Sequence, residues 1–167
     1  MNIVKATAKY EAWLATHLKM AAKDLDFKHQ QMRLAPFPFL RATYYRWAQV
    51  FPKVCAEAAK APVVLAVGDL HVENFGTWRD IEGRLIWGIN DFDEAWRLPY
   101  THDLVRLAAS ALMARIGCDP KAGIEALLQG YVDALKAGGR PFALAMVRSA
   151  VWCSASAKGR PAAFRAS

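Results

Sequence analysis

Two short apolar runs, each followed by an acidic loop, limit the folds open to this chain. Residues 63–67 read VVLAV and lead into GDLHVENFG, and residues 85–89 read LIWGI and lead into NDFDEA. Short runs rich in β-branched and aromatic residues are typical of strands. We expect 63–67 to form a buried strand. We also expect 77–90 to form two strands around a turn at Glu82-Gly83.

Helical spacing of apolar residues dominates the rest of the chain. It predicts helices over 4–25 and 42–60, the second kinked or split at Pro52. It also predicts a helix over 104–116 with Asp103 as N-cap, and one that starts at Asp119-Pro120 and ends at Gly138-Gly139. Residues 33–41 contain two prolines, so we expect them to be extended. The expected fold class is α/β (α+β), mostly helical, with a small β-sheet that carries the two acidic loops.

The net charge of +7 is unevenly distributed. Residues 61–117 carry five Lys/Arg against eight Asp/Glu, whereas the segments before and after them are basic. An acidic centre with basic flanks suits either a metal site for a phosphorylated ligand or a scatter of solvated lysines. No apolar run reaches the roughly 18–20 residues that span a bilayer, and no secretory signal is evident. We therefore expect a cytoplasmic protein that does not insert into membranes.

The two loops hold the side chains that phosphoryl transfer needs. Asp69 and Asn74 are separated by four residues, and Asp91 directly follows the second strand-like run. One carboxylate must accept the proton of the attacking hydroxyl, and others must hold Mg²⁺ against nucleotide phosphates. Asp, Asn and Gly are also the usual residues of turns, so either loop alone would be weak evidence.

GDLHVENFG followed by NDFDEA resembles the catalytic and metal loops of the aminoglycoside-phosphotransferase and protein-kinase-like superfamily. The stretch from about Met32 to Ala114, with PFPFLR (36–41) and HDLVRLAAS (102–110), is similar to the DUF2252 family of bacterial proteins. The resemblance implies a fold like the kinase C-terminal lobe, and a kinase-like phosphotransferase that uses ATP and Mg²⁺ on an unknown acceptor. Nucleotidyl transfer is a variant that the sequence leaves open.

The resemblance also implies roles for individual residues. Asp69 would be the catalytic base, with His71 beside it in the same loop. Asn74, Asp91 and Asp93 would be metal ligands. Arg41 and Arg106 could reach phosphates, or could instead brace a helix surface or the core. Asp103 would be a structural acid that caps its helix and braces the catalytic loop.

A kinase also needs a Gly-rich loop over the phosphates and a lysine on a nearby strand, and this sequence contains neither. We therefore expect residues 1–148 to be a partial kinase-like domain that ends before these elements. Residues 149–167 are expected to be a disordered or aberrant tail. A separate chain could supply the missing lobe, and the chain alone is expected to show little catalysis.

Two other functions are compatible with the sequence. GDLH is similar to the Asp-x-His of dinuclear phosphoesterases, although the chain has only four histidines and no GNH motif. A non-catalytic protein could instead bind nucleic acid through the basic flanks, with its six Trp and five Tyr as stacking platforms. Nucleic acid is the less expected partner, because these aromatics lie mostly in helical patterns.

Overall fold

A computed structural model describes residues 2–114, 117 and 119–144. The helices in order are α1 (Ile3–Ala15), α2 (Ala22–Leu34), α3 (Pro36–Ala42), α4 (Tyr44–Val54), α5 (Tyr100–Met113) and α6 (Pro120–Lys136), with 3₁₀ turns η1 (Ala58–Lys60) and η2 (Val72–Asn74). The strands are β1 (Val63–Ala66), β2 (Phe75–Arg79), β3 (Leu85–Ile89), β4 (Trp96–Pro99) and β5 (Phe142–Ala143). The class is therefore mixed α+β and mostly helical, as predicted.

The strands form two small antiparallel sheets. β1 pairs with β4 in a two-stranded sheet, with Val63 opposite Pro99 and Ala66 opposite Trp96. The second sheet has the order β2-β3-β5. The predicted hairpin is confirmed, because Phe75 pairs with Ile89 and Arg79 with Leu85 around the turn at Gly83.

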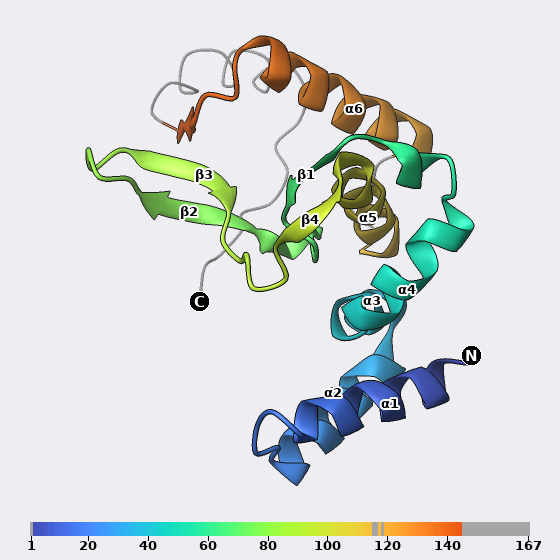
Figure 1. Ribbon diagram of the computed structural model, residues 1–167. Helices are drawn as coiled ribbons and strands as arrows, with labels where there is room; N and C mark the ends of the chain where they lie inside the picture. Colours follow the sequence, from blue (N-terminus) through green and yellow to red (C-terminus); the bar gives the residue numbers. More distant parts are fainter. Residues whose placement is uncertain (1, 115–116, 118, 145–167) are drawn as a thin grey trace.

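The elements are arranged along one axis (Figure 1). α1 and α2 form one end, α3 and α4 follow, and the sheets with α5 and α6 form the other end. α5 packs against α6, β1 and α3. The loops that follow β1 and β3 thus lie between the N-terminal helices and α5. Within the described part of the chain, no helix is both long and apolar enough to cross a membrane.

The last described helix has the ends that its sequence predicts. Asp119 caps α6, and its carboxylate accepts a hydrogen bond of 2.9 Å from the backbone N–H of Ala122. Pro120 stands at the first helical position, where its missing N–H costs nothing. Gly138 and Gly139 follow the helix with φ of 77° and 64°, a conformation that favours glycine.

Two predictions for the N-terminal region are wrong. The helix expected over 4–25 stops at Ala15, where the Thr16 hydroxyl donates to the Trp13 carbonyl at 2.7 Å. Such side-chain bonds to the backbone compete with helix continuation. Residues 33–41 are not extended, because α3 begins at Pro36. Proline is tolerated in the first turn of a helix, since the N–H groups there have no partner within the helix.

Three further expectations need correction. β1 is not buried, since Val63 and Leu65 are 55% and 79% exposed. Asp103 does not cap α5, which begins earlier at Tyr100 and leaves Asp103 in its first turn. The helix expected over 42–60 is shorter, since α4 ends at Val54, although the expected break near Pro52 is present and the 3₁₀ turn η1 follows it. Strands β4 and β5 were not predicted, and the tail over 149–167 lies outside the described residues.

Candidate functional site

Helix α5 holds the loop that follows β1. The buried carboxylate of Asp103 accepts hydrogen bonds from the backbone N–H groups of Val67 at 2.7 Å and Gly68 at 3.0 Å. A carboxylate that accepts two backbone N–H groups makes charge-assisted bonds, which are stronger than neutral ones. The predicted bracing role of Asp103 is therefore confirmed, although its capping role is not.

Arg106 reaches the same loop from one turn further along α5. Its side chain is fully buried, and its Nε donates to Asp69 Oδ1 at 2.7 Å while Nη2 contacts the same oxygen. Nη2 also donates to the Leu40 carbonyl on α3 at 3.0 Å. The guanidinium lies 5.0 Å from the Tyr44 ring and 5.1 Å from the Trp47 ring. Of its two predicted roles, Arg106 has the core-bracing one in this structure.

Ser110 completes the polar stripe on α5. Its buried hydroxyl accepts a hydrogen bond of 3.1 Å from the backbone N–H of Val72. Asp103, Arg106 and Ser110 are spaced by three and four residues, so they share one face of the helix. The sequence did not predict a role for Ser110, although three polar residues at helical spacing along one helix were the available signal.

Asn74 joins the two acidic loops. Its buried amide donates from Nδ2 to the carbonyls of Asp69 at 3.3 Å and Asp91 at 3.1 Å. Its Oδ1 accepts the backbone N–H of Asp91 at 2.9 Å. The oxygen that the resemblance assigns to a metal is therefore already engaged by the protein. In this structure Asn74 fastens the loop of Asp69 to the loop of Asp91.

The two loops line one cavity of about 460 Å³ against α2 and α3. Four of the predicted site residues, Arg41, Asp69, His71 and Asp91, line this cavity. Asp93 does not, and its backbone N–H donates to Asp91 Oδ1 at 3.0 Å. The other lining residues come mostly from the two helices: Phe27, Gln31, Phe37, Pro38 and Ala42, together with Glu73 from the loop.

His71 lies on the cavity wall with little exposure. Its side chain is buried, and its Nδ1 has no hydrogen-bond partner among the described residues. The ring meets Phe37 edge to face at 6.0 Å between centroids. Burial lowers the pKa of His71, and the nearby Asp69 opposes this effect. The lowered pKa favours the neutral imidazole at pH 7.

Negative charge concentrates in the second acidic loop, around Glu94. The pKa of Glu94 is raised, first by burial and then by the charges of Asp69, Asp93 and Asp91. Burial and the Glu94 charge raise the pKa of Tyr44 to about 12. Glu94 was not among the predicted site residues.

The donor set fits Mg²⁺ better than a transition metal. In the described part of the chain, no three His, Cys, Asp or Glu side chains are grouped closely enough to hold a metal ion by themselves. Magnesium sites in phosphate chemistry use one or two carboxylates, with water and substrate phosphates as the remaining ligands. Asp91 in the cavity lining supplies one such carboxylate, and Asp93 lies beside it, since its backbone N–H donates to Asp91 Oδ1.

A protein-family model matches most of the chain. The family model described as "Uncharacterized protein conserved in bacteria (DUF2252)" matches residues 21–154. No curated protein and no solved structure matches the chain. The matched range includes α2 to β5 and every residue of the cavity described above. On this match, which covers most of its length, the chain belongs to the DUF2252 family.

Proposed function

We propose that the cavity between the two acidic loops is the catalytic centre of a kinase-like phosphotransferase that uses ATP and Mg²⁺. The observation that carries the proposal is the Asn74 bridge, which brings the Asp69 and Asp91 loops to one cavity. Two acidic loops placed together supply both the base and the metal ligand that phosphoryl transfer requires. The acceptor is unknown.

In this proposal Asp69 is the base. Arg106 occupies its Oδ1 and leaves Oδ2 free to take the proton of an acceptor hydroxyl. The guanidinium also fixes the orientation of the carboxylate, which matters because positioning supplies much of the rate. His71 lines the same cavity, and we assign its ring to contact the bound substrate.

Metal and phosphate contacts are assigned to the remaining residues. Asp91, with Asp93 beside it, would hold Mg²⁺, and the ion would neutralise charge on the transferred phosphoryl group. Arg41 would contact phosphate. It is now paired with Glu73 at 2.5 Å, and both side chains are about half exposed. Exposed ion pairs are worth only about 0–1 kcal/mol, so a phosphate can displace Glu73 at little cost.

The arrangement of small sheets on a helical body supports the further proposal of a kinase-like C-terminal lobe. Because the 167 residues contain no Gly-rich loop, we propose that the phosphate cover comes from another segment or chain. On this proposal the chain alone binds nucleotide weakly and turns over slowly. For the phosphoesterase alternative, His71 is the single histidine among the described cavity residues, and nothing in the site favours it.

The binding test is a melting experiment with ATP and MgCl₂. We expect the Tm of the wild-type chain to rise with both present and not with ATP alone. Asp91→Ala should abolish the rise. The matched control is Asp133→Ala, which removes an exposed carboxylate of α6 and should leave the rise intact. A Tm unaffected by ATP with Mg²⁺, or equally raised in Asp91→Ala, would contradict the proposal.

The chemistry is tested with labelled ATP. Transfer of label from the γ-phosphate to the protein or to acceptors in an extract would indicate phosphotransfer. Transfer of label from the α-phosphate to the same acceptors would indicate nucleotidyl transfer. Either signal should be lost in Asp69→Asn. Label incorporation that persists in Asp69→Asn would show that Asp69 is not the base.

A further inference from the structure

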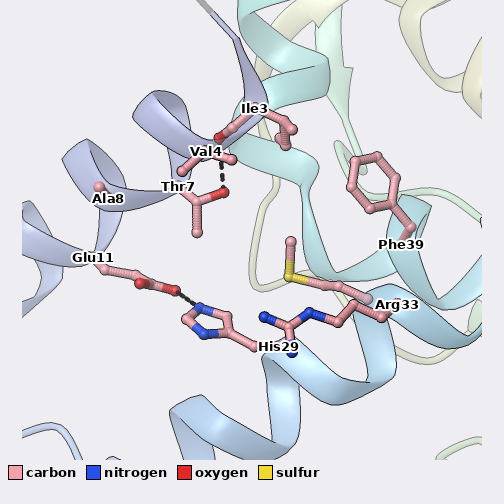
Figure 2. A pocket seen from close by; sticks show the side chains of 9 residues that line it. Ile3, Val4, Thr7, Ala8, Glu11, His29, Arg33 and Phe39 are labelled. Atoms are coloured by element: carbon pink, nitrogen blue, oxygen red, sulfur yellow. Dashed lines mark hydrogen bonds and ion pairs between the residues drawn. The ribbon is translucent and has the colours of Figure 1, made fainter.

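A second cavity lies between α1 and α2 (Figure 2), and the α2 residues that line it differ from those that line the first cavity. Its volume is about 360 Å³, within the range of small-molecule sites. Phe27 and Gln31 of α2 face the first cavity, whereas His29, Met32 and Arg33 line the second. The remaining lining residues are Ile3, Val4, Thr7, Ala8 and Glu11 of α1 and Phe39 of α3.

The cavity exists because its two helices pack on different neighbours. α1 packs against α4, whereas α2 packs against α3. A hydrogen bond of 2.8 Å between Glu11 and His29 links α1 to α2 at one end. The space beyond this link is walled by apolar side chains such as Ile3, Val4 and Met32. An apolar ligand body would therefore gain contacts that the protein itself does not make there.

Among the charged groups of this cavity, Glu11 has partners within the protein and Arg33 has none among the described residues. The Glu11 carboxylate is held by His29 at 2.8 Å and lies 4.0 Å from the Lys28 ammonium. Arg33 makes no hydrogen bond or ion pair with any described residue. Figure 2 shows its guanidinium pointing back along α2 toward the Glu11–His29 pair. The unneutralised charge of the cavity, among its described residues, is therefore positive.

We propose that this cavity is a binding site for a small amphipathic monocarboxylate, with the carboxylate on Arg33 and the alkyl or aryl body against the α1–α2 walls. A guanidinium binds a carboxylate through two parallel hydrogen bonds, which combines charge and geometry. A neutral apolar molecule would leave Arg33 unpaired. An amine would face the Arg33 charge and find Glu11 already engaged. The site is separate from the acidic cavity and does not rest on the proposed phosphotransferase activity.

The test compares octanoate, octanol and octylamine as ligands of the full chain by calorimetry. We expect octanoate to bind, and the other two to bind at least about tenfold more weakly, because a charge-assisted hydrogen bond is worth about that factor or more. Arg33→Gln should weaken the binding of octanoate by a similar factor. Lys23→Gln removes the same charge from the same helix outside the cavity and should bind like the wild type.

A second variant tests the cavity independently of its charge. Ala8→Phe places a ring in the space between the helices from an exposed position on α1, so the fold should be retained. We expect octanoate binding to be lost while the Tm stays near that of the wild type. Equal binding of octanol and octanoate, unchanged binding by Arg33→Gln, or no binding of octanoate would each overturn the proposal.

Discussion

Single residues set the distance between the two acidic loops. Gly68 has a φ of 88°, and a Cβ placed there would lie 2.2 Å from the carbonyl oxygen of Glu94. That oxygen belongs to the backbone of the second loop and cannot turn away. The residue before the proposed base is therefore limited to glycine for two reasons, its conformation and the space around it.

Comparison with a second glycine separates these two reasons. Gly83 has a similar φ of 76°, but a methyl group added there would meet nothing within 4 Å. We expect Gly83→Ala to cost about 1 kcal/mol of unfolding free energy from the left-handed backbone alone. Gly68→Ala should cost clearly more, measured by urea denaturation. Equal costs would mean that the two loops are not in close contact at Gly68.

The charge of Glu94 gives a pH-dependent prediction. Its pKa is raised above that of the unfolded chain, so the native state binds more protons and stability falls as the pH rises through the native pKa. Glu94→Gln removes this loss, and we expect a higher Tm than the wild type at pH 7 with a smaller difference at pH 4. Glu125→Gln, on the exposed side of α6, is the matched control. A lower Tm for Glu94→Gln at pH 7 would contradict the charge cluster.

His71 predicts the opposite pH dependence. Burial lowers its native pKa below the unfolded value of 6.5, so the unfolded chain binds the extra proton first. Stability should therefore decrease as the pH falls below about 6.5. We expect His71→Asn to show a flatter pH dependence of Tm between pH 7 and 5 than the wild type. The same slope of Tm against pH in both proteins would mean that protonation of His71 does not destabilise the folded state.

At the scale of elements, α5 organises the first acidic loop. Its polar stripe of Asp103, Arg106 and Ser110 bonds the loop at successive points from Val67 to Val72. Each bond is buried or partly buried, so the loss of one partner leaves an unsatisfied group rather than a solvated one. The position of the loop therefore depends on α5.

Asp103→Asn tests this organisation. The amide keeps the shape but loses the charge and one acceptor, so we expect a loss of about 1–3 kcal/mol in unfolding free energy. Asp119→Asn at the N-cap of α6 is the control, because Asn caps helices about as well as Asp. A similar small effect for both variants would show that the loop is not held by α5.

The elements also show where reasoning from sequence succeeds. The β2–β3 hairpin and α6 follow from local signals, a turn at Gly83 and a capped, glycine-terminated helix. α3 was missed because its prolines fall in the first turn, which depends on where the helix begins. β4 was missed because a strand of four residues is defined by its pairing with β1, which no local pattern specifies.

At the scale of the molecule, much apolar surface remains uncovered. On β1, Val63, Val64 and Leu65 are 55%, 43% and 79% exposed, and Trp96 on the paired strand β4 is 72% exposed. A two-stranded sheet is marginal by itself and is usually extended or covered. Exposed apolar residues on a short sheet promote association between molecules.

Leu65→Thr is the corresponding prediction. Because the side chain is exposed, the unfolding free energy should change by less than about 0.5 kcal/mol, while light scattering on heating should decrease. Ile81→Thr, at an exposed turn position away from β1, is the control and should leave the scattering unchanged. A large loss of stability in Leu65→Thr would mean that the side chain is packed.

The candidate site was only partly accessible from the sequence. The spacing of Asp69, Asn74 and Asp91 predicted that the loops meet, and the Asn74 hydrogen bonds agree with that. The burial of Arg106 and the proximity of Glu94 to the other carboxylates depend on packing between distant segments. Such contacts leave no periodic signal in one chain.

The Asn74 amide has a mechanical consequence. Because two of its hydrogen bonds join it to the backbone of Asp91, we expect the Asp69 and Asp91 loops to move together. The opposite wall is looser, since α2 has no buried residue and meets the loops through the exposed Arg41–Glu73 contact of its neighbour α3. We therefore expect a ligand too large for the cavity to shift α2 rather than the acidic loops.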